Sequence, residues 1–153
     1  MAPAFVIQPP FPGADQARLG QAFAVRRRVF IEEQRVPEAE ELDRFDRDAW
    51  HWLAVAEQGE AIGTARLLTP APGVGKVGRV AVLASHRGAG VGKALMLAVI
   101  AHARRAGYRQ LKLDSQVHAR GFYERLGFAA YGEEFLDANI PHRHMALALA
   151  PDQ

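Results

Sequence analysis

Cysteine is absent from the 153 residues of this chain. Its absence excludes disulfide bonds, thiolate metal ligands and cysteine nucleophiles. It also suits a reducing compartment, so we expect a cytoplasmic protein. No apolar run approaches the ~18 residues that a membrane-spanning helix needs, and residues 1–11 lack the basic cluster of a secretory signal. We therefore expect one domain over residues 1–153, without membrane association.

Lysine is scarce, and arginine carries nearly all of the positive charge. The 19 basic and 17 acidic residues leave a net charge of +2, which gives little support to nucleic-acid binding. Arginine favours bidentate contacts with carboxylate or phosphate groups. The run of three arginines at 26–28 falls in a helical pattern, where a solvated face is expected.

Hydrophobic periodicity predicts alternating strands and helices. Apolar spacings near 3.6 predict helices over 15–33 and 94–106 and a short helix over 119–126. Alternating or apolar runs predict strands over 51–57, 61–68, 76–83, 110–116, 129–135 and 144–149. The predicted loops are 8–14, 36–39 and 69–75, and residues 38–48 form a loop or a short helix. With one further strand ahead of the first helix, the order β-α-β-β-β-α-β-α-β-β predicts an α/β chain around a mixed sheet, because hairpins and helical crossovers coexist.

A glycine-rich segment, Arg87 to Lys93, separates a predicted strand from a predicted helix. Its small residues let several backbone N–H groups converge, and the helix N-terminus adds partial positive charge, which suits a phosphate or pyrophosphate. A P-loop is excluded, because Arg87 stands where the first glycine belongs and Ala94 where Ser or Thr belongs. A dinucleotide-binding loop is also excluded, because Lys93 replaces its third glycine.

Two motifs together resemble the GNAT superfamily of N-acetyltransferases. Arg87, Gly90 and Gly92 match its R/Q-x-x-G-x-G/A signature, in which the loop holds the pyrophosphate of acetyl-CoA. Residues 122–128, with the sequence FYERLGF, resemble the second signature, a helix beneath the CoA tail. Within the superfamily, residues 25–34, 62–67, 131–135 and 140–145 are similar to the ElaA/YjcF-like acetyltransferases. The first of these segments also resembles the acyl-homoserine-lactone synthases.

The resemblance implies an α/β GNAT fold and acetyl-CoA as co-substrate. The expected sheet is central, twisted, mixed and mostly antiparallel, with about six to seven strands, about four flanking helices and splayed central strands. In such folds the pantetheine arm fills the gap and pairs with a strand, here residues 79–83. The implied CoA-binding residues are Val80, Ala81, Val82, Arg87, Gly88, Ala89, Gly90, Val91, Gly92, Lys93, Gln116 and Tyr123. Gln116 departs from the pattern, because many members have asparagine there.

Acetyl transfer to an amine sets chemical requirements that candidate residues must meet. The amine must lose a proton, the developing oxyanion must be stabilised, and the leaving thiolate should gain a proton. No covalent enzyme intermediate is needed, so the lack of cysteine is no objection. The resemblance places the Tyr123 hydroxyl beside the CoA sulfur. A phenol with an ordinary pKa near ~10 carries its proton at neutral pH, so we expect Tyr123 to be the acid.

The general base is less sharply defined. The candidates are Glu32, Glu33, Glu134, Asp137, His118, His142 and His144. The resemblance places Glu134 and His142 in the C-terminal region that shapes the acceptor pocket, and these two are the predicted catalytic partners of Tyr123. For Glu32 and Glu33 the alternative is ion pairing with arginines along the helix. His142 and His144 lack a convincing third ligand, so no metal is expected.

Acidic residues are concentrated outside the predicted CoA-binding elements. They are Glu32, Glu33, Glu38, Glu40, Glu41, Asp43, Glu133, Glu134 and Asp137. A carboxylate-lined entrance would favour a cationic amine; solvated surface is the alternative. We therefore expect an acetyl-CoA-dependent N-acetyltransferase acting by direct attack on a small-molecule or peptide amine. The alternatives are an acyltransferase using a longer acyl group and a non-catalytic acyl-CoA-binding module. No nucleic-acid or membrane partner is expected, and a homodimer is one option.

Overall fold

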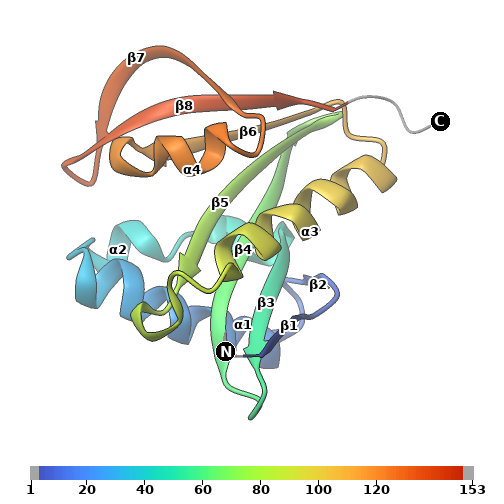
Figure 1. Ribbon diagram of the computed structural model, residues 1–153, viewed down its shortest axis with the longest axis vertical. Helices are drawn as coiled ribbons and strands as arrows, with labels where there is room; N and C mark the ends of the chain where they lie inside the picture. Colours follow the sequence, from blue (N-terminus) through green and yellow to red (C-terminus); the bar gives the residue numbers. More distant parts are fainter. Residues whose placement is uncertain (1–3, 150–153) are drawn as a thin grey trace.

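The computed structural model describes residues 4–149, which build a twisted sheet of eight strands. The strands are β1 (Phe5–Ile7), β2 (Phe11–Pro12), β3 (Trp50–Ala56), β4 (Ala61–Ala71), β5 (Val74–Val82), β6 (Gln110–Gln116), β7 (Ala129–Asp137) and β8 (Ile140–Ala148). Their spatial order is β1-β3-β4-β5-β6-β8-β7, and β2 also pairs with β3 (Figure 1). Within residues 4–149, β5 and β6 are parallel and the other pairs antiparallel. The predicted mixed, mostly antiparallel sheet is confirmed.

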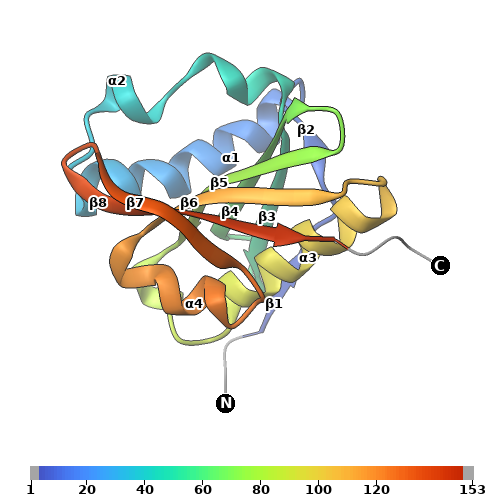
Figure 2. The same ribbon diagram turned by 90° about the horizontal axis from the view of Figure 1, so that it is seen from above.

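Helices cover both faces of this sheet. They are α1 (Gln16–Arg26), the π-helix η1 (Arg27–Glu33), α2 (Glu38–Glu41), α3 (Val91–Arg105) and α4 (Arg120–Glu124), with 3₁₀ turns η2 (Arg44–Asp48), η3 (Ala84–His86) and η4 (Val117–Ala119). Figure 2 shows α1 on one side of the sheet, and α3 and α4 on the other. None of the helices within residues 4–149 has the length and apolar character needed to cross a membrane.

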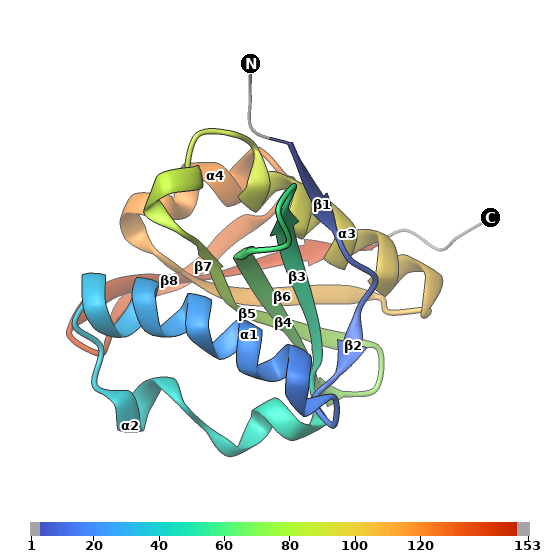
Figure 3. The ribbon, with the colours of Figure 1, turned by 90° about the horizontal axis from the view of Figure 1, so that it is seen from below.

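The two long helices follow from local sequence signals. The side chain of Asp15 accepts a hydrogen bond from the Arg18 N–H at 3.2 Å and so caps the start of α1. Leu19 and Val25 form its buried face, which lies against β3, β4 and β5 (Figure 3). On α3, the buried residues Leu95, Met96, Val99, Ile100 and Ala103 recur at helical spacing and pack into the main core.

Several element boundaries differ from the sequence prediction. The predicted helix over 15–33 changes to π-helical geometry at Arg27. Strand β4 extends into the predicted loop 69–75 and ends at Ala71. An irregularity in its pairing beyond Leu68 accommodates Pro70. The predicted loop 8–14 contains β2, which is too short to show a periodic pattern. Strand β8 already begins at Ile140, four residues before the predicted start.

The centre of the sheet is opened by a splay and a bulge. Strands β5 and β6 pair from Val74 to Val77 and from Gln110 to Leu113, and beyond these residues they separate. Against β4, one residue is added in β5 between Gly78 and Ala81. Arg79 lies at this bulge with a φ of 51°, a left-handed conformation that is costly for a residue with a Cβ. The splayed central strands expected from the resemblance are therefore present.

Candidate functional site

A cavity of about 1210 Å³ occupies the gap between the separating strands. One wall is formed by residues 76–82 of β5, and the other by residues 113–116 of β6 together with α4. Residues of η1 and η2 close a third side, and Asp137 and His142 enter from the β7–β8 hairpin. Side chains from five or more segments distant in sequence thus meet in one hollow.

The glycine-rich loop ends at the mouth of this cavity. Gly88 and Gly90 adopt φ values of 83° and 85°, which glycine reaches without strain. A Cβ built on either residue would meet nothing within 4 Å, so the loop faces open space. Within residues 4–149, the backbone N–H groups of residues 88–93 have no backbone acceptor. These free donors at the start of α3 fit a pyrophosphate group.

Arg87 is held away from the glycine loop by two specific contacts. Its Nη1 and Nη2 donate to the carboxylate of Glu33 at 2.9 and 2.8 Å, and its Nε donates to the Val82 carbonyl at 3.0 Å. Glu33 therefore pairs across the cavity mouth, and the alternative of an ion pair along its own helix is not formed. The bidentate pair links η1 to the segment that follows β5.

Gln116 bridges the cavity at its β6 side. Its side-chain amide donates to Gln34 Oε1 at 2.7 Å, and its amide oxygen lies 2.7 Å from His118 Nε2. All three residues line the cavity. Gln116, the residue that departs from the asparagine of the family pattern, therefore connects the end of β6 to the end of η1.

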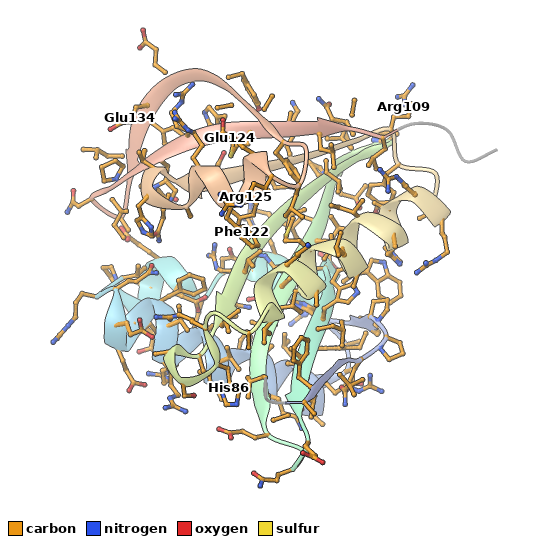
Figure 4. The ribbon with its side chains drawn as sticks, in the orientation of Figure 1. His86, Arg109, Phe122, Glu124, Arg125 and Glu134 are labelled. Atoms are coloured by element: carbon orange, nitrogen blue, oxygen red, sulfur yellow. The ribbon has the colours of Figure 1, made fainter. Side chains whose placement is uncertain are left out.

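Tyr123 lines the cavity from α4, with its ring edge-on to those of Phe122 and Phe128. Phe122 also lies close to Gly92, because a Cβ added there would be 3.5 Å from its ring. Burial raises the pKa of the Tyr123 hydroxyl to about 12. The phenol is therefore a proton donor throughout the neutral range. Figure 4 shows Phe122 on the side of α4 that faces the lower half of the sheet.

His142 enters the same cavity from β8, with a relative exposure of 9%. Its Nδ1 lies 2.6 Å from the carbonyl oxygen of Ile140. Because a carbonyl only accepts, Nδ1 donates the hydrogen of this bond, and Nε2 is the ring nitrogen left for another partner. Phe135 of β7 stacks on the ring and fixes its plane. The hydrogen bond and the stacked ring restrain the orientation of the imidazole.

Glu134, the other predicted catalytic partner, is not brought together with Tyr123. It is exposed on the edge strand β7 and does not line the cavity, and Figure 4 shows it at the outer side of the hairpin. Of the nine acidic residues expected at an entrance, Glu33, Asp43 and Asp137 line the cavity. Glu33 and Asp43 are already paired with arginines, so their charges are compensated. The expected convergence of the acidic segments on the cavity is therefore limited to these three residues.

A further group of polar and charged side chains lies where the gap between β5 and β6 closes. Lys76 Nζ donates to Asp114 at 2.9 Å, and His144 Nδ1 lies 2.6 Å from the other carboxylate oxygen. Burial opposes ionisation of Asp114, but the hydrogen bonds from Lys76 and His144 outweigh it and lower its pKa. His144 thus belongs to an ion-paired group, while His142 alone of the two histidines lines the cavity.

The expectation of a solvated arginine run is wrong for Arg26. Its side chain is 1% exposed and bonds to Glu41 at 2.7 Å and Asp46 at 2.8 Å. Sequence reasoning also missed Arg66 and Arg79, which line the cavity from β4 and β5. The available signal was an arginine interrupting an apolar strand, since such a residue must find a partner when the strand is buried.

Comparison with known proteins gives one consistent family. Residues 15–149 match the family model described as acetyltransferase (GNAT) domain. The chain is 39% identical over 132 residues to the uncharacterized N-acetyltransferase YjcF of Bacillus subtilis, covering 86% of this chain and 93% of that protein.

Two solved structures share the fold over nearly the whole length. An acyl-CoA N-acyltransferase from Pseudomonas aeruginosa has a TM-score of 0.85 and 31% identity, covering 95% of this chain and 100% of that one. Escherichia coli ElaA has a TM-score of 0.83 and 26% identity, covering 94% and 99%. The expected likeness to ElaA and YjcF is confirmed.

Proposed function

This chain belongs to the GNAT acetyltransferase family, with ElaA and YjcF among its relatives, and on that premise we propose that it transfers the acetyl group of acetyl-CoA to an amine. The acceptor is a small molecule or a peptide, and it attacks the thioester directly. One observation carries the proposal: the cavity between β5 and β6 joins the free N–H groups of the glycine loop to Tyr123 and His142.

Acetyl-CoA would be held by three parts of this chain. The free N–H groups of residues 88–93 would bind the pyrophosphate, because backbone donors and a helix N-terminus favour an anion. The edge of residues 80–82 on β5, which has no strand beside it across the gap, would pair with the pantetheine amides. Gln116 would add an amide contact from the opposite wall once its bonds to Gln34 and His118 rearrange.

The proton transfers follow from the two side chains inside the cavity. His142 Nε2 would accept a proton from the incoming amine, directly or through a water molecule. The amine nitrogen then forms a bond to the acetyl carbonyl carbon, and a backbone N–H of the β5 edge stabilises the resulting oxyanion. As the C–S bond breaks, Tyr123 would give its hydroxyl proton to the thiolate, the new amide nitrogen would return its extra proton to the tyrosinate, and His142 would release the proton it accepted to solvent. The high pKa of Tyr123 ensures that it carries this proton.

The acceptor we propose is a cationic amine of modest size. Asp48 and Asp137 line the cavity, and neither has an ion-pair partner within the described part of the chain. Phe30 of η1 and Phe45 of η2 line the cavity on the side of Asp48 and give an apolar wall. Carboxylates beside an apolar wall suit an ammonium group carried on a hydrocarbon or aromatic body.

A turnover screen tests the proposal. Purified protein with acetyl-CoA and a panel of primary amines, cationic peptides included, should release free CoA above the rate without amine. Parallel reactions with a longer acyl-CoA determine whether the acyl pocket prefers acetyl. Tight acetyl-CoA binding without amine-dependent CoA release from any acceptor would contradict the transferase and favour the non-catalytic module.

A further inference from the structure

Six charged side chains beside the cavity form a closed ring of alternating sign. Around the ring, the N–O distances are Arg26–Glu41 2.7 Å, Glu41–Arg79 3.2 Å, Arg79–Asp43 3.1 Å, Asp43–Arg66 2.7 Å, Arg66–Asp46 3.1 Å and Asp46–Arg26 2.8 Å. Three arginines alternate with three carboxylates, so the ring is neutral. We call this set the charge ring.

The charge ring joins residues 41–46 to three elements, α1, β4 and β5, that pack against one another. Arg26 comes from α1, Arg66 from β4 and Arg79 from β5, whereas the three carboxylates all come from residues 41–46. The part around Arg26 is almost fully buried, and the part formed by Asp43 and Arg79 is about one quarter exposed at the cavity wall. The segment 41–46 is thereby fastened to the sheet at the bulge.

Arg79 is the ring member with an unfavourable backbone. Its φ of 51° is a conformation that glycine usually supplies at a bulge of this kind. Its guanidinium donates to the carbonyls of Glu40 and Glu41 at 3.2 and 2.9 Å, besides its ion pairs. These directional bonds end on the segment that Arg26 and Arg66 also hold. The strained residue is therefore anchored through its own side chain.

We propose that the charge ring is a positioning device that holds Arg79 in the bulge conformation and thereby sets the place of the β5 edge at residues 80–82. Burying charges brings little net stability compared with apolar packing, because desolvation offsets most of the attraction. What guanidinium–carboxylate contacts supply is fixed geometry. In this view Arg79 and Asp43 act through the backbone and do not contact the acceptor.

This inference rests on the proposed function, since the β5 edge matters only if it holds the thioester. Two substitutions at position 79 distinguish the effect of backbone geometry from the effect of the guanidinium charge. Arg79→Ala removes the guanidinium and keeps a Cβ that resists positive φ, whereas Arg79→Gly removes the guanidinium and relieves the strain. We expect Arg79→Ala to lower kcat by ~10-fold to ~10²-fold, as misplacement of reacting groups does, and Arg79→Gly to recover most of that loss.

A double-mutant cycle adds an independent measure. Asp43→Asn should lower kcat in the wild-type background and have little further effect beside Arg79→Gly, because the bulge then no longer needs the ring. Thermal melts identify variants that fail to fold, and if Arg79→Ala is one of them, the cycle still decides. An equal decrease of kcat in Arg79→Ala and Arg79→Gly would overturn the inference. So would an effect of Asp43→Asn on kcat that is the same in the wild-type and the Arg79→Gly backgrounds. Absence of turnover in the wild-type protein would instead refute the proposed function.

Discussion

Tyr123 and His142 line the same cavity in different surroundings. Tyr123 is held among aromatic rings, and burial keeps its proton in place. His142 donates through Nδ1 to the Ile140 carbonyl and lines the cavity. In the proposed reaction Tyr123 would act as the acid and His142 as the base.

At Tyr123, removing only the hydroxyl separates chemistry from binding. Tyr123→Phe keeps the ring and its contacts, so acetyl-CoA affinity measured by calorimetry should stay nearly unchanged. Loss of the proton donor should lower kcat by ~10²-fold, within the range of general acid catalysis. Turnover equal to wild type, in an assay where chemistry limits the rate, would remove Tyr123 from the mechanism.

At His142, we expect the loss of a base. His142→Gln keeps a polar side chain but has no basic nitrogen, so kcat for the best amine should fall by ~10²-fold. His86 provides a matched control, since it is a partly exposed histidine of η3 outside the cavity lining (Figure 4). His86→Gln should leave kcat unchanged. A His142→Gln enzyme as fast as this control would assign the base elsewhere.

At the scale of elements, the start of α3 and the gap beside β5 are parts of one binding surface. The glycine loop leaves its N–H groups free, and Phe122 of α4 lies over Gly92. Binding of an anion by this loop therefore depends on the shape of its backbone more than on its side chains. A substitution that changes backbone conformation should affect it most.

Gly90→Val tests this dependence on backbone shape. Valine disfavours the φ of 85° at the cap of α3, so the N–H groups should lose their convergence. The Kd for acetyl-CoA should rise by about 10-fold to 10²-fold, the worth of one or two hydrogen bonds to a charged group. Gly107 is the control, because it lies past the other end of α3 with a φ of 82° and equally open space. Gly107→Val should destabilise the fold similarly and leave the Kd unchanged.

At the scale of the whole molecule, the charge ring makes the stability of the fold depend on pH. Burial opposes ionisation of Asp46, but its hydrogen bond and charge contact with Arg26, and those with Arg66, outweigh burial and lower its pKa. The pKa of Asp43 is lowered in the same way by Arg66 and Arg79. Both carboxylates therefore stay ionised in the folded protein at pH values below their ordinary pKa.

Acid should accordingly destabilise this protein through the ring. A lowered folded pKa contributes stability that is present above the unfolded value of about 3.9 and is lost as pH falls through the folded value. We expect the free energy of unfolding, from urea titrations, to decrease between about pH 5 and pH 3. Asp46→Asn removes one of these groups, so its stability should be lower at neutral pH and should change less over that interval. An unchanged pH dependence in this variant would exclude Asp46 as a contributor.

The sequence alone determined the order of the long helices and of strands β3 to β8, the glycine loop and the place of Tyr123 in a short helix. These features are local: periodicity defines α3, and the left-handed turns at Gly88 and Gly90 require glycine whatever surrounds them. The two signatures around them are also contiguous in sequence. Such patterns can be read without knowing which distant residues meet.

Only the tertiary structure decided which charges pair and which candidate base reaches the cavity. Arg87 meets Glu33 54 positions away, and Gln116 meets Gln34 82 positions away, so no local pattern contains these contacts. His142 lines the cavity and Glu134 does not, because β8 lies beside β6 whereas β7 is the edge strand. The bulge at Arg79 likewise depends on its distant partners. Which buried charges pair depends on the folded sheet. A buried charge without a partner is unfavourable because of desolvation, and folding brings these partners, distant in sequence, within reach of one another.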